Sequence, residues 1–198
     1  VQGAFKAVAD SVGEFPTEEN VSRMIELAGQ VDGYATAAKM LDSQLERADS
    51  LDPELEAWMS AKLGELYGHR LGEPELAVIA MERALPFMDA DASFLAELLS
   101  LYRTTGNVDA AMLTFLRLAD CQKDQERRQT LIERSLFAVD NHLLDEAVTT
   151  LRGLSELEFD PEVDSMLEEI LEEHGRFGDL ITHLERKAGR EGYEADMA

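Results

Sequence analysis

The sequence repeats itself at intervals of 33 to 40 residues, and this periodicity restricts the fold more than any other feature. The segment GEPELAVIAMERAL (72–85) matches GNVDAAMLTFLRLA (106–119) with a constant spacing of 34 residues. The residues at one equivalent position, at successive spacings of 40, 34, 36 and 33, are Ala37, Ala77, Ala111, Ala147 and Leu180. A repeat of this length indicates an array of identical small units that bury their apolar faces on one another.

Each unit reads as two helices joined by a turn. In the third unit Leu95, Leu98 and Tyr102 share a stripe with the three- and four-residue spacing of a helix face. Gly106 suits a left-handed residue at a helix end, and Asn107 suits the cap of the next helix. No period-two strand pattern of useful length occurs. We predict helices over 4–13, 17–30, 33–48, 53–70, 74–87, 92–104, 108–121, 125–140, 144–155, 161–174 and 177–188.

Helix starts are marked at several other places. Asp52-Pro53 and Asp160-Pro161 each put a capping oxygen before a proline in the first helical turn. Glu73-Pro74 looks similar, and Thr17 precedes another acidic first turn. These signals support the predicted helix boundaries.

At these residues the sequence resembles the tetratricopeptide repeat (TPR) family. The second unit matches that family's pattern best, and the residues that carry the match are Leu63, Gly64, Tyr67, Ala77, Met81 and Ala84. The resemblance implies an all-α fold, an α-solenoid of about five stacked helix–turn–helix repeats. It implies a repeat or cap helix in 1–16, the solenoid domain in 17–188 and a frayed tail in 189–198. The opening helix looks like the second half of a preceding unit, as in a segment of a longer array.

The first, fourth and fifth units depart from the family pattern. Arg134 and Ser135 stand where Leu and a small residue are usual, and Leu180 replaces the small Ala. The pattern is informative about the fold and nearly silent about the function.

Composition excludes some classes of partner. The net charge of −23 repels phosphate backbones and anionic lipid, so we expect neither nucleic acid nor membrane as a partner. A basic protein would be attracted, although acidity also serves solubility alone. A single cysteine fits a reducing compartment, and no signal peptide or membrane span is recognisable, so we predict a cytoplasmic protein.

The resemblance assigns the binding groove to the first helix of each pair. The groove positions map to Ser22, Glu26, Trp58, Ala61, Glu65, His69, Ala96, Ser100, Arg103, Gln129, Ile132 and Glu169. Some family members clamp a terminal carboxylate with Lys and Asn at these positions. This chain has no such set there, so we do not expect a carboxylate clamp.

Two features of the groove have alternative interpretations. Trp58, the only tryptophan, either anchors a partner or packs between helix pairs. The segment 162–173 contains six acids and no base, and it includes Glu169, Glu172 and Glu173. Such a run is usually the solvated face of a helix, and the alternative is a dock for a Lys- or Arg-rich segment.

No motif for catalysis, cofactor binding or metal binding occurs. The four histidines lack metal-site spacing, and no phosphate loop or nucleophile elbow is present. His174 is best explained by a helix end, and Cys121 is expected to be a buried structural thiol. We therefore predict a chain that is not an enzyme and that has no cofactor.

The leading hypothesis is a scaffold that binds a peptide or protein on its groove. The alternative is a self-association or assembly module within a larger protein, in which copies pair through exposed solenoid ends. An exposed apolar stripe on a terminal helix would favour the alternative.

Overall fold

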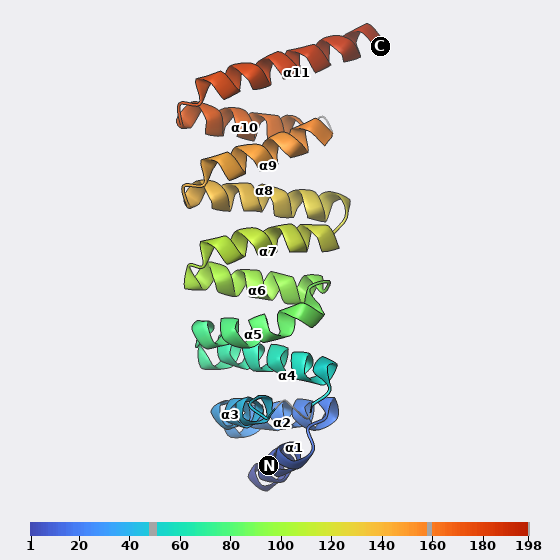
Figure 1. Cartoon of the computed structure of the whole chain (residues 1–198), viewed down its shortest axis with the longest axis vertical. Helices are drawn as coiled ribbons and strands as arrows, with labels where there is room; N and C mark the ends of the chain where they lie inside the picture. The colour runs from blue at the N-terminus through green and yellow to red at the C-terminus, as the bar shows by residue number, and fades with distance from the viewer. Residues whose placement is uncertain (48–50, 158–159, 198) are drawn as a thin grey trace. The chain divides into compact units, whose positions relative to one another are not determined.

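The computed structural model describes residues 1–47, 51–157 and 160–197, and these residues form helices without a strand (Figure 1). The chain divides into two compact units, which we call unit 1 (Val1–Cys121) and unit 2 (Gln122–Ala198). The helices are α1 (Gln2–Glu14), α2 (Glu18–Val31), α3 (Tyr34–Leu45), α4 (Pro53–Glu65), η2 (Leu66–Leu71), α5 (Pro74–Met88), α6 (Ala92–Thr105), α7 (Val108–Cys121), α8 (Asp124–Asp140), α9 (Leu144–Leu157), α10 (Pro161–Glu173) and α11 (Phe177–Met197).

At most of the predicted helix starts, a side chain accepts a capping hydrogen bond from the backbone. The Asp52 carboxylate accepts a bond from the Glu54 backbone N–H at 2.9 Å, and the Asp160 carboxylate accepts one from Glu162 N–H at 3.1 Å. Asp91, which we did not predict as a cap, accepts bonds from Ser93 N–H at 2.8 Å and from Phe94 N–H at 3.0 Å. These acceptors satisfy backbone donors that have no partner inside the helix.

Glu73 does not cap its helix through its side chain, and the similarity to the two Asp-Pro starts is misleading there. The turn is made instead by Gly72, whose φ of 68° lies in the left-handed region that glycine enters without steric cost. Gly106 ends α6 in the same way, with φ of 70°, as the sequence predicts.

The predicted continuous helix over 53–70 changes character at Glu65. The α-helical part α4 ends there, and the chain continues as the π-helix η2 through Leu71. A π-helical turn contains more residues than an α-helical turn, so it rotates the side chains that follow. It therefore changes the direction in which His69 and Arg70 leave the backbone.

In unit 1, consecutive helices pack as antiparallel hairpins around small residues. Ala37, Ala77 and Ala111 are fully buried, as the repeat predicts. At Gly64 the packing is closest, because a Cβ built there would lie 2.3 Å from Met81 Cγ and 3.3 Å from the Ala77 carbonyl oxygen. Only a residue without a side chain allows α4 and α5 to approach this closely.

In unit 1, two hydrogen bonds join the first helix of one hairpin to the second helix of the hairpin before it. The Tyr67 hydroxyl donates to the Asp42 carboxylate, and the Tyr102 hydroxyl donates to Glu82 at 2.9 Å. Burial raises the pKa of both hydroxyls well above the ordinary tyrosine value, and the hydrogen bond that each hydroxyl donates to a carboxylate raises it further. Both phenols are therefore neutral in the folded state.

Unit 2 packs α8 to α11 around a smaller apolar cluster. Its fully buried members include Leu151, Leu167 and Leu171. Ile132 also belongs to this cluster, with 5% of its surface exposed, so its assignment to the groove is wrong. Leu180 lies against the cluster, whereas Leu184, which continues the repeat phase in the sequence, is 43% exposed.

Two helix ends differ from the prediction. α3 ends at Leu45, and the predicted end at 48 lies outside the described residues. α11 continues to Met197, past the predicted end at 188. The side chains of 190–198 lie outside the described residues, and the predicted division into 1–16, 17–188 and 189–198 stays a prediction.

Candidate functional site

Four of the predicted groove residues lie on successive turns of the second repeat. Trp58, Ala61 and Glu65 belong to α4, and His69 belongs to η2. Spacings of three and four residues place the first three on one side of α4. His69 follows the π-helical turn and neighbours Glu65 in one of the hollows described below. The surface beside them is hollowed in two places, and both hollows lie within unit 1.

The first hollow, here named the α4–α6 hollow, has a volume of about 310 Å³. Its lining comes from α4, α5, the Asp91 cap and α6: Trp58, Ala61, Lys62, Glu65, Met81, Met88, Asp91, Ser93, Phe94 and Glu97. Large apolar side chains form one part of this lining and carboxylates form another. Such a mixture suits a ligand group that has an apolar body and a polar end.

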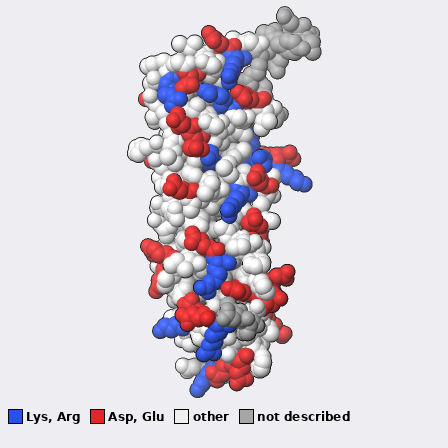
Figure 2. All heavy atoms as spheres, viewed as in Figure 1, with Lys and Arg blue, Asp and Glu red and all other residues white. Residues whose placement is uncertain are grey.

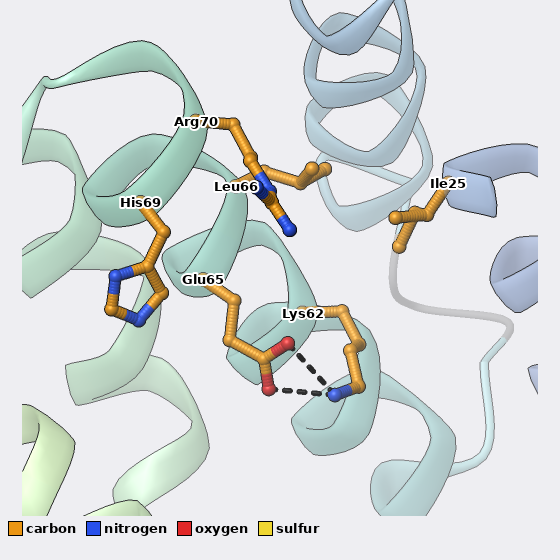
Figure 3. A pocket seen from close by; sticks show the side chains of 6 residues that line it. All are labelled: Ile25, Lys62, Glu65, Leu66, His69 and Arg70. Atoms are coloured by element: carbon orange, nitrogen blue, oxygen red, sulfur yellow. Dashed lines mark hydrogen bonds and ion pairs between the residues drawn. The ribbon is translucent and has the colours of Figure 1, made fainter. Parts of the chain in front are cut away.

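The second hollow, here named the α2–η2 hollow, has a volume of about 350 Å³. Figure 3 shows Ile25 of α2 on one side, with Leu66, Arg70 and Lys62 on the side toward it and His69 farther away. The lining is Ile25, Lys62, Glu65, Leu66, His69 and Arg70. Two of these side chains are permanent cations, so this hollow differs in charge from its neighbour.

An ion pair is common to both hollows. Lys62 Nζ lies 2.6 Å from Glu65 Oε1 and 2.8 Å from Oε2, and both residues line each hollow (Figure 3). Because the pair is partly exposed and joins residues one helical turn apart, it contributes little to stability. It is therefore available to rearrange when a ligand group arrives.

A second polar contact links η2 to α6. His69 Nε2 lies 2.7 Å from Glu97 Oε1, an ion-pair distance when the imidazole is protonated. His69 is 64% exposed and Glu97 is 24% exposed. The carboxylate of Glu97 lies at the edge of the α4–α6 hollow, and its Oε1 is buried without a hydrogen-bond partner among the described residues.

Arg70 is positioned by an aromatic ring. Its guanidinium carbon lies 5.4 Å from the centre of the Tyr34 ring, within the range of a cation–π contact. The π-helical turn brings Arg70 and His69 to the α2–η2 hollow. This placement could not be read from the sequence, where an uninterrupted α-helix was expected.

Other predicted groove residues lie outside the two hollows. Glu26 is exposed and pairs with Arg23 at 2.5 Å. Ser100 and Arg103 are exposed on α6. The structure therefore brings together Trp58, Glu65 and His69, and leaves the remaining unit 1 candidates beside them or farther along the face.

Trp58 packs on the core, as one of its two interpretations expects, and its role as a partner anchor stays a prediction. It is half-buried and packs against the apolar core of unit 1, and part of its surface lines the α4–α6 hollow. A tryptophan held on one side by the core is a rigid contact surface for a ligand.

In unit 2 the acidic segment is partly neutralised within the fold. Glu168 pairs with Lys187 at 2.7 Å, and Asp164 is fully buried and accepts a bond from Ser155 at 2.5 Å. Glu169, Glu172 and Glu173 are exposed on α10. On the face drawn in Figure 2, basic side chains lie among the acidic ones.

The structure also contains a buried histidine that we had not singled out as a core residue. His183 is 3% exposed, and its Nε2 lies 3.5 Å from Asp164 Oδ1 and 3.6 Å from Glu168 Oε1. Its position three residues after Leu180 places it on the inward side of α11. That spacing was the one available signal for its burial.

The predictions for the other sulfur and histidine side chains have mixed outcomes. Cys121 is exposed, so the predicted buried thiol is wrong. It is the last residue of α7, and its Sγ lies 3.7 Å from the Asp89 carbonyl oxygen. His174 caps the end of α10, with Nδ1 2.9 Å from the Ile170 carbonyl oxygen, as the helix-end interpretation requires.

Within the part of the chain that the structure describes, no group of three or more His, Cys, Asp or Glu residues could hold a metal ion. No described helix is both long and apolar enough to cross a bilayer.

Solved structures with the same arrangement of helix hairpins are known. The chain is similar to BtubC (BKLC) from P. vanneervenii with a TM-score of 0.51 and 14% identity, over 98% of this chain and 89% of that one. It is similar to MamA with a TM-score of 0.50 and 15% identity, over 98% and 96% of the two chains. A putative kinesin light chain from Podosopora anserina with nearly identical TPR-like repeats aligns with a TM-score of 0.48 and 16% identity, over 90% and 96%.

The chain has a TPR-like fold. The helix hairpins within each unit and the repeat spacing agree with this likeness, which at such low identity concerns the fold alone. No protein-family model and no curated protein matches the sequence. The function of this TPR-like chain must therefore be inferred from its own surface.

Proposed function

We propose that this TPR-like chain is a non-catalytic, cytoplasmic scaffold that binds a peptide or protein on the first-helix face of unit 1. We define that face by α2, α4, η2 and α6. The observation that carries the proposal is the pair of adjacent hollows that share Lys62 and Glu65. Two neighbouring hollows suit consecutive side chains of one bound segment.

The half-buried Trp58 and its apolar neighbours supply the anchoring surface. Few contacts dominate binding free energy in most interfaces, and tryptophan is prominent among them. We expect Trp58→Ala to weaken partner binding by about 2 kcal/mol.

The test is site-specific photo-crosslinking. A benzophenone amino acid is placed at Ser93, which lines the α4–α6 hollow and is exposed, or at Ile79, which is 60% exposed on α5. We expect Ser93 to capture a protein that Ile79 does not. The captured protein is identified by mass spectrometry, purified and rebound to the wild-type chain and to Trp58→Ala. Capture at Ile79 without capture at Ser93 would reject the first-helix face.

The acids on α10 are a further part of the proposal. Glu169, Glu172 and Glu173 are exposed and would accelerate the approach of a basic partner. Changing all three to Gln should slow association of the captured partner and reduce its dependence on salt. An unchanged association rate and salt dependence would remove the α10 acids from the binding surface.

A second candidate function, self-association, is favoured by a specific observation on α11. Phe177 is 59% exposed, Ile181 is 58% exposed and Leu184 is 43% exposed, and their spacing makes one apolar stripe. An exposed stripe of this kind is suited to pairing with a second copy.

Light scattering distinguishes this candidate. A dimer that Ile181→Ser dissociates, and that the equally exposed Ile79→Ser leaves intact, would support assembly through α11. A monomer at all concentrations would reject it.

A further inference from the structure

We infer that the α4–α6 hollow receives an arginine side chain of the bound partner. This inference rests on the proposed function and adds the chemistry of one residue that the partner presents. It is argued from the apolar wall, the carboxylates and the charge of the neighbouring hollow.

The apolar wall fits the body of an arginine. Met81 and Phe94 are buried and form the closed part of the hollow, while Trp58 and Met88 are half-buried and remain accessible. The aliphatic stem of arginine packs on such surfaces, and its planar guanidinium stacks on an indole ring. Methionine side chains adapt their shape to the group that enters.

Three carboxylates lie around the same hollow. They belong to Glu65, Asp91 and Glu97, and the one permanent cation in the lining is Lys62. Three negative charges against one positive charge leave a formal charge of −2 on the lining. This charge attracts a cation and repels an acidic side chain.

The three carboxylates differ in the contacts that they already make. Asp91 accepts the backbone bonds of Ser93 and Phe94 through Oδ1. Glu65 pairs with Lys62 and can rearrange, and Glu97 has a buried Oε1 without a hydrogen-bond partner in the part of the chain that the structure describes. A guanidinium has five donors in a rigid fork, so it can contact more than one of these acceptors at once, which the ammonium of lysine does less well.

The neighbouring α2–η2 hollow disfavours a second cation. Its lining includes Lys62 and Arg70 against the single carboxylate of Glu65. The bound segment should therefore present one arginine at the α4–α6 hollow and a neutral or acidic side chain at the α2–η2 hollow. The charge difference between the hollows decides which side chain enters which hollow.

Trp58 is the only tryptophan in the chain, so its signals report directly on this hollow. The first test is a titration of the whole chain with N-acetyl-arginine methylamide, followed by the NMR resonance of the Trp58 indole N–H and by tryptophan emission. We expect a saturable shift with a dissociation constant on the order of millimolar, as is usual for so small a ligand. The citrulline analogue, which has the same shape without the charge, should bind at least tenfold more weakly, and the glutamate analogue should not bind.

Two variants test whether arginine binds at these carboxylates. Glu97→Gln and Glu65→Gln should each weaken arginine binding by about threefold or more. Glu75→Gln makes the same charge change on an exposed part of α5 in the same unit, and it should leave the affinity unchanged. An unaltered Trp58 spectrum without ligand shows that each variant is folded.

Several outcomes would overturn the inference: equal binding of arginine and citrulline, tighter binding of glutamate, or no change at Trp58. The titration uses no protein partner, so it fails independently of the proposed function. Capture at Ser93 combined with no arginine binding would reject this inference alone. Absence of capture at Ser93 would reject the proposed function whatever the titration shows.

Discussion

Unit 1 and unit 2 are built from the same helix hairpin, but different interactions hold their hairpins together. In unit 1 the contacts are chiefly apolar, with Gly64 allowing two helices to touch and two tyrosine hydroxyls bonding to carboxylates. In unit 2 the ionisable side chains Arg134, Asp164 and His183 are buried. Ionisable groups therefore enter the interior in a region where the repeat pattern is weak.

In unit 2, several ion pairs join one hairpin to the next. Arg128 contacts both Asp160 and Glu162, and Arg176 contacts Asp145 at 2.7 Å. Within one hairpin, Arg134 of α8, which stands where the family has Leu, reaches Glu146 of α9 at 2.7 Å and also donates to Thr150. A hairpin that lacks part of the apolar pattern can thus still stack, with its stability depending more strongly on protonation and on salt.

The largest effect is expected from the buried carboxylate of unit 2. Asp164→Ala removes the acceptor of Ser155 and the carboxylate beside His183, and we expect a loss of about 3–5 kcal/mol of unfolding free energy. The measurement is urea unfolding, with hydrogen exchange in α10 and α11 to locate the change. Glu169→Ala, on the exposed side of α10, should change stability by less than about 0.5 kcal/mol. A small effect of Asp164→Ala would show that charge is not structural in unit 2.

The close helix contact of unit 1 should give the next largest effect. Gly64→Ala forces a methyl group against Met81 Cγ, an atom too near the backbone to swing away, so we expect a loss of about 1–3 kcal/mol. Unfolding of unit 1 is followed through the emission of Trp58. Unchanged stability would mean that α4 and α5 separate without cost.

Alkaline pH should destabilise unit 1 through its buried tyrosines. The pKa of each hydroxyl of Tyr67 and Tyr102 is raised in the folded state, so the stabilisation is complete below the ordinary value of about 10 and is lost as pH rises through the raised pKa. The double change to Phe should cost about 1 kcal/mol at pH 7 and reduce the alkaline loss. The test compares urea midpoints of Trp58 emission between pH 8 and pH 11. An equal alkaline loss in the variant would contradict the assignment.

Acidic pH should destabilise unit 2, as alkaline pH should destabilise unit 1. Hydrogen bonding from Arg128 lowers the pKa of Asp160, so its stabilisation is present above the ordinary value of about 4 and is lost as pH falls through the lowered pKa. Arg128→Gln should cost about 1 kcal/mol or less at pH 7, since the pair is partly exposed, and should flatten the acid dependence. Hydrogen exchange in α8 and α10 at pH 3 and pH 7 measures this. Arg23→Gln, in the exposed pair of α2, is the control that should not flatten it.

The smallest expected effect is a gain. Gly153 lies inside α9, and a Cβ built there meets no atom within 4 Å. Gly153→Ala should therefore stabilise unit 2 by about 0.5–1 kcal/mol through helix propensity. A rise in the thermal midpoint is the readout. Destabilisation would show that close packing requires glycine at position 153, as it does at Gly64.

The sequence by itself determined the all-helical hairpins, most of their ends and the burial of Ala77 and Ala111. These features depend on residues near in the sequence, since periodicity, capping and small side chains act over a few helical turns. The resemblance to the TPR family assigned Trp58, Glu65 and His69 to one face. It could not show that Ile132 is buried or that Cys121 is exposed, because each depends on how a helix end or a neighbouring hairpin packs.

Only the tertiary structure decided the hollows and the internal charge pairs. Met81, Asp91 and Glu97 join Trp58 because α5 and α6 pack beside α4, and the π-helical turn directs Arg70 to the neighbouring hollow. The pairing of Lys187 with Glu168 likewise joins residues of different helices. The sequence gives the charge of each side chain, but packing decides which opposite charge lies beside it. The charge and chemistry of the binding face depend on those pairings.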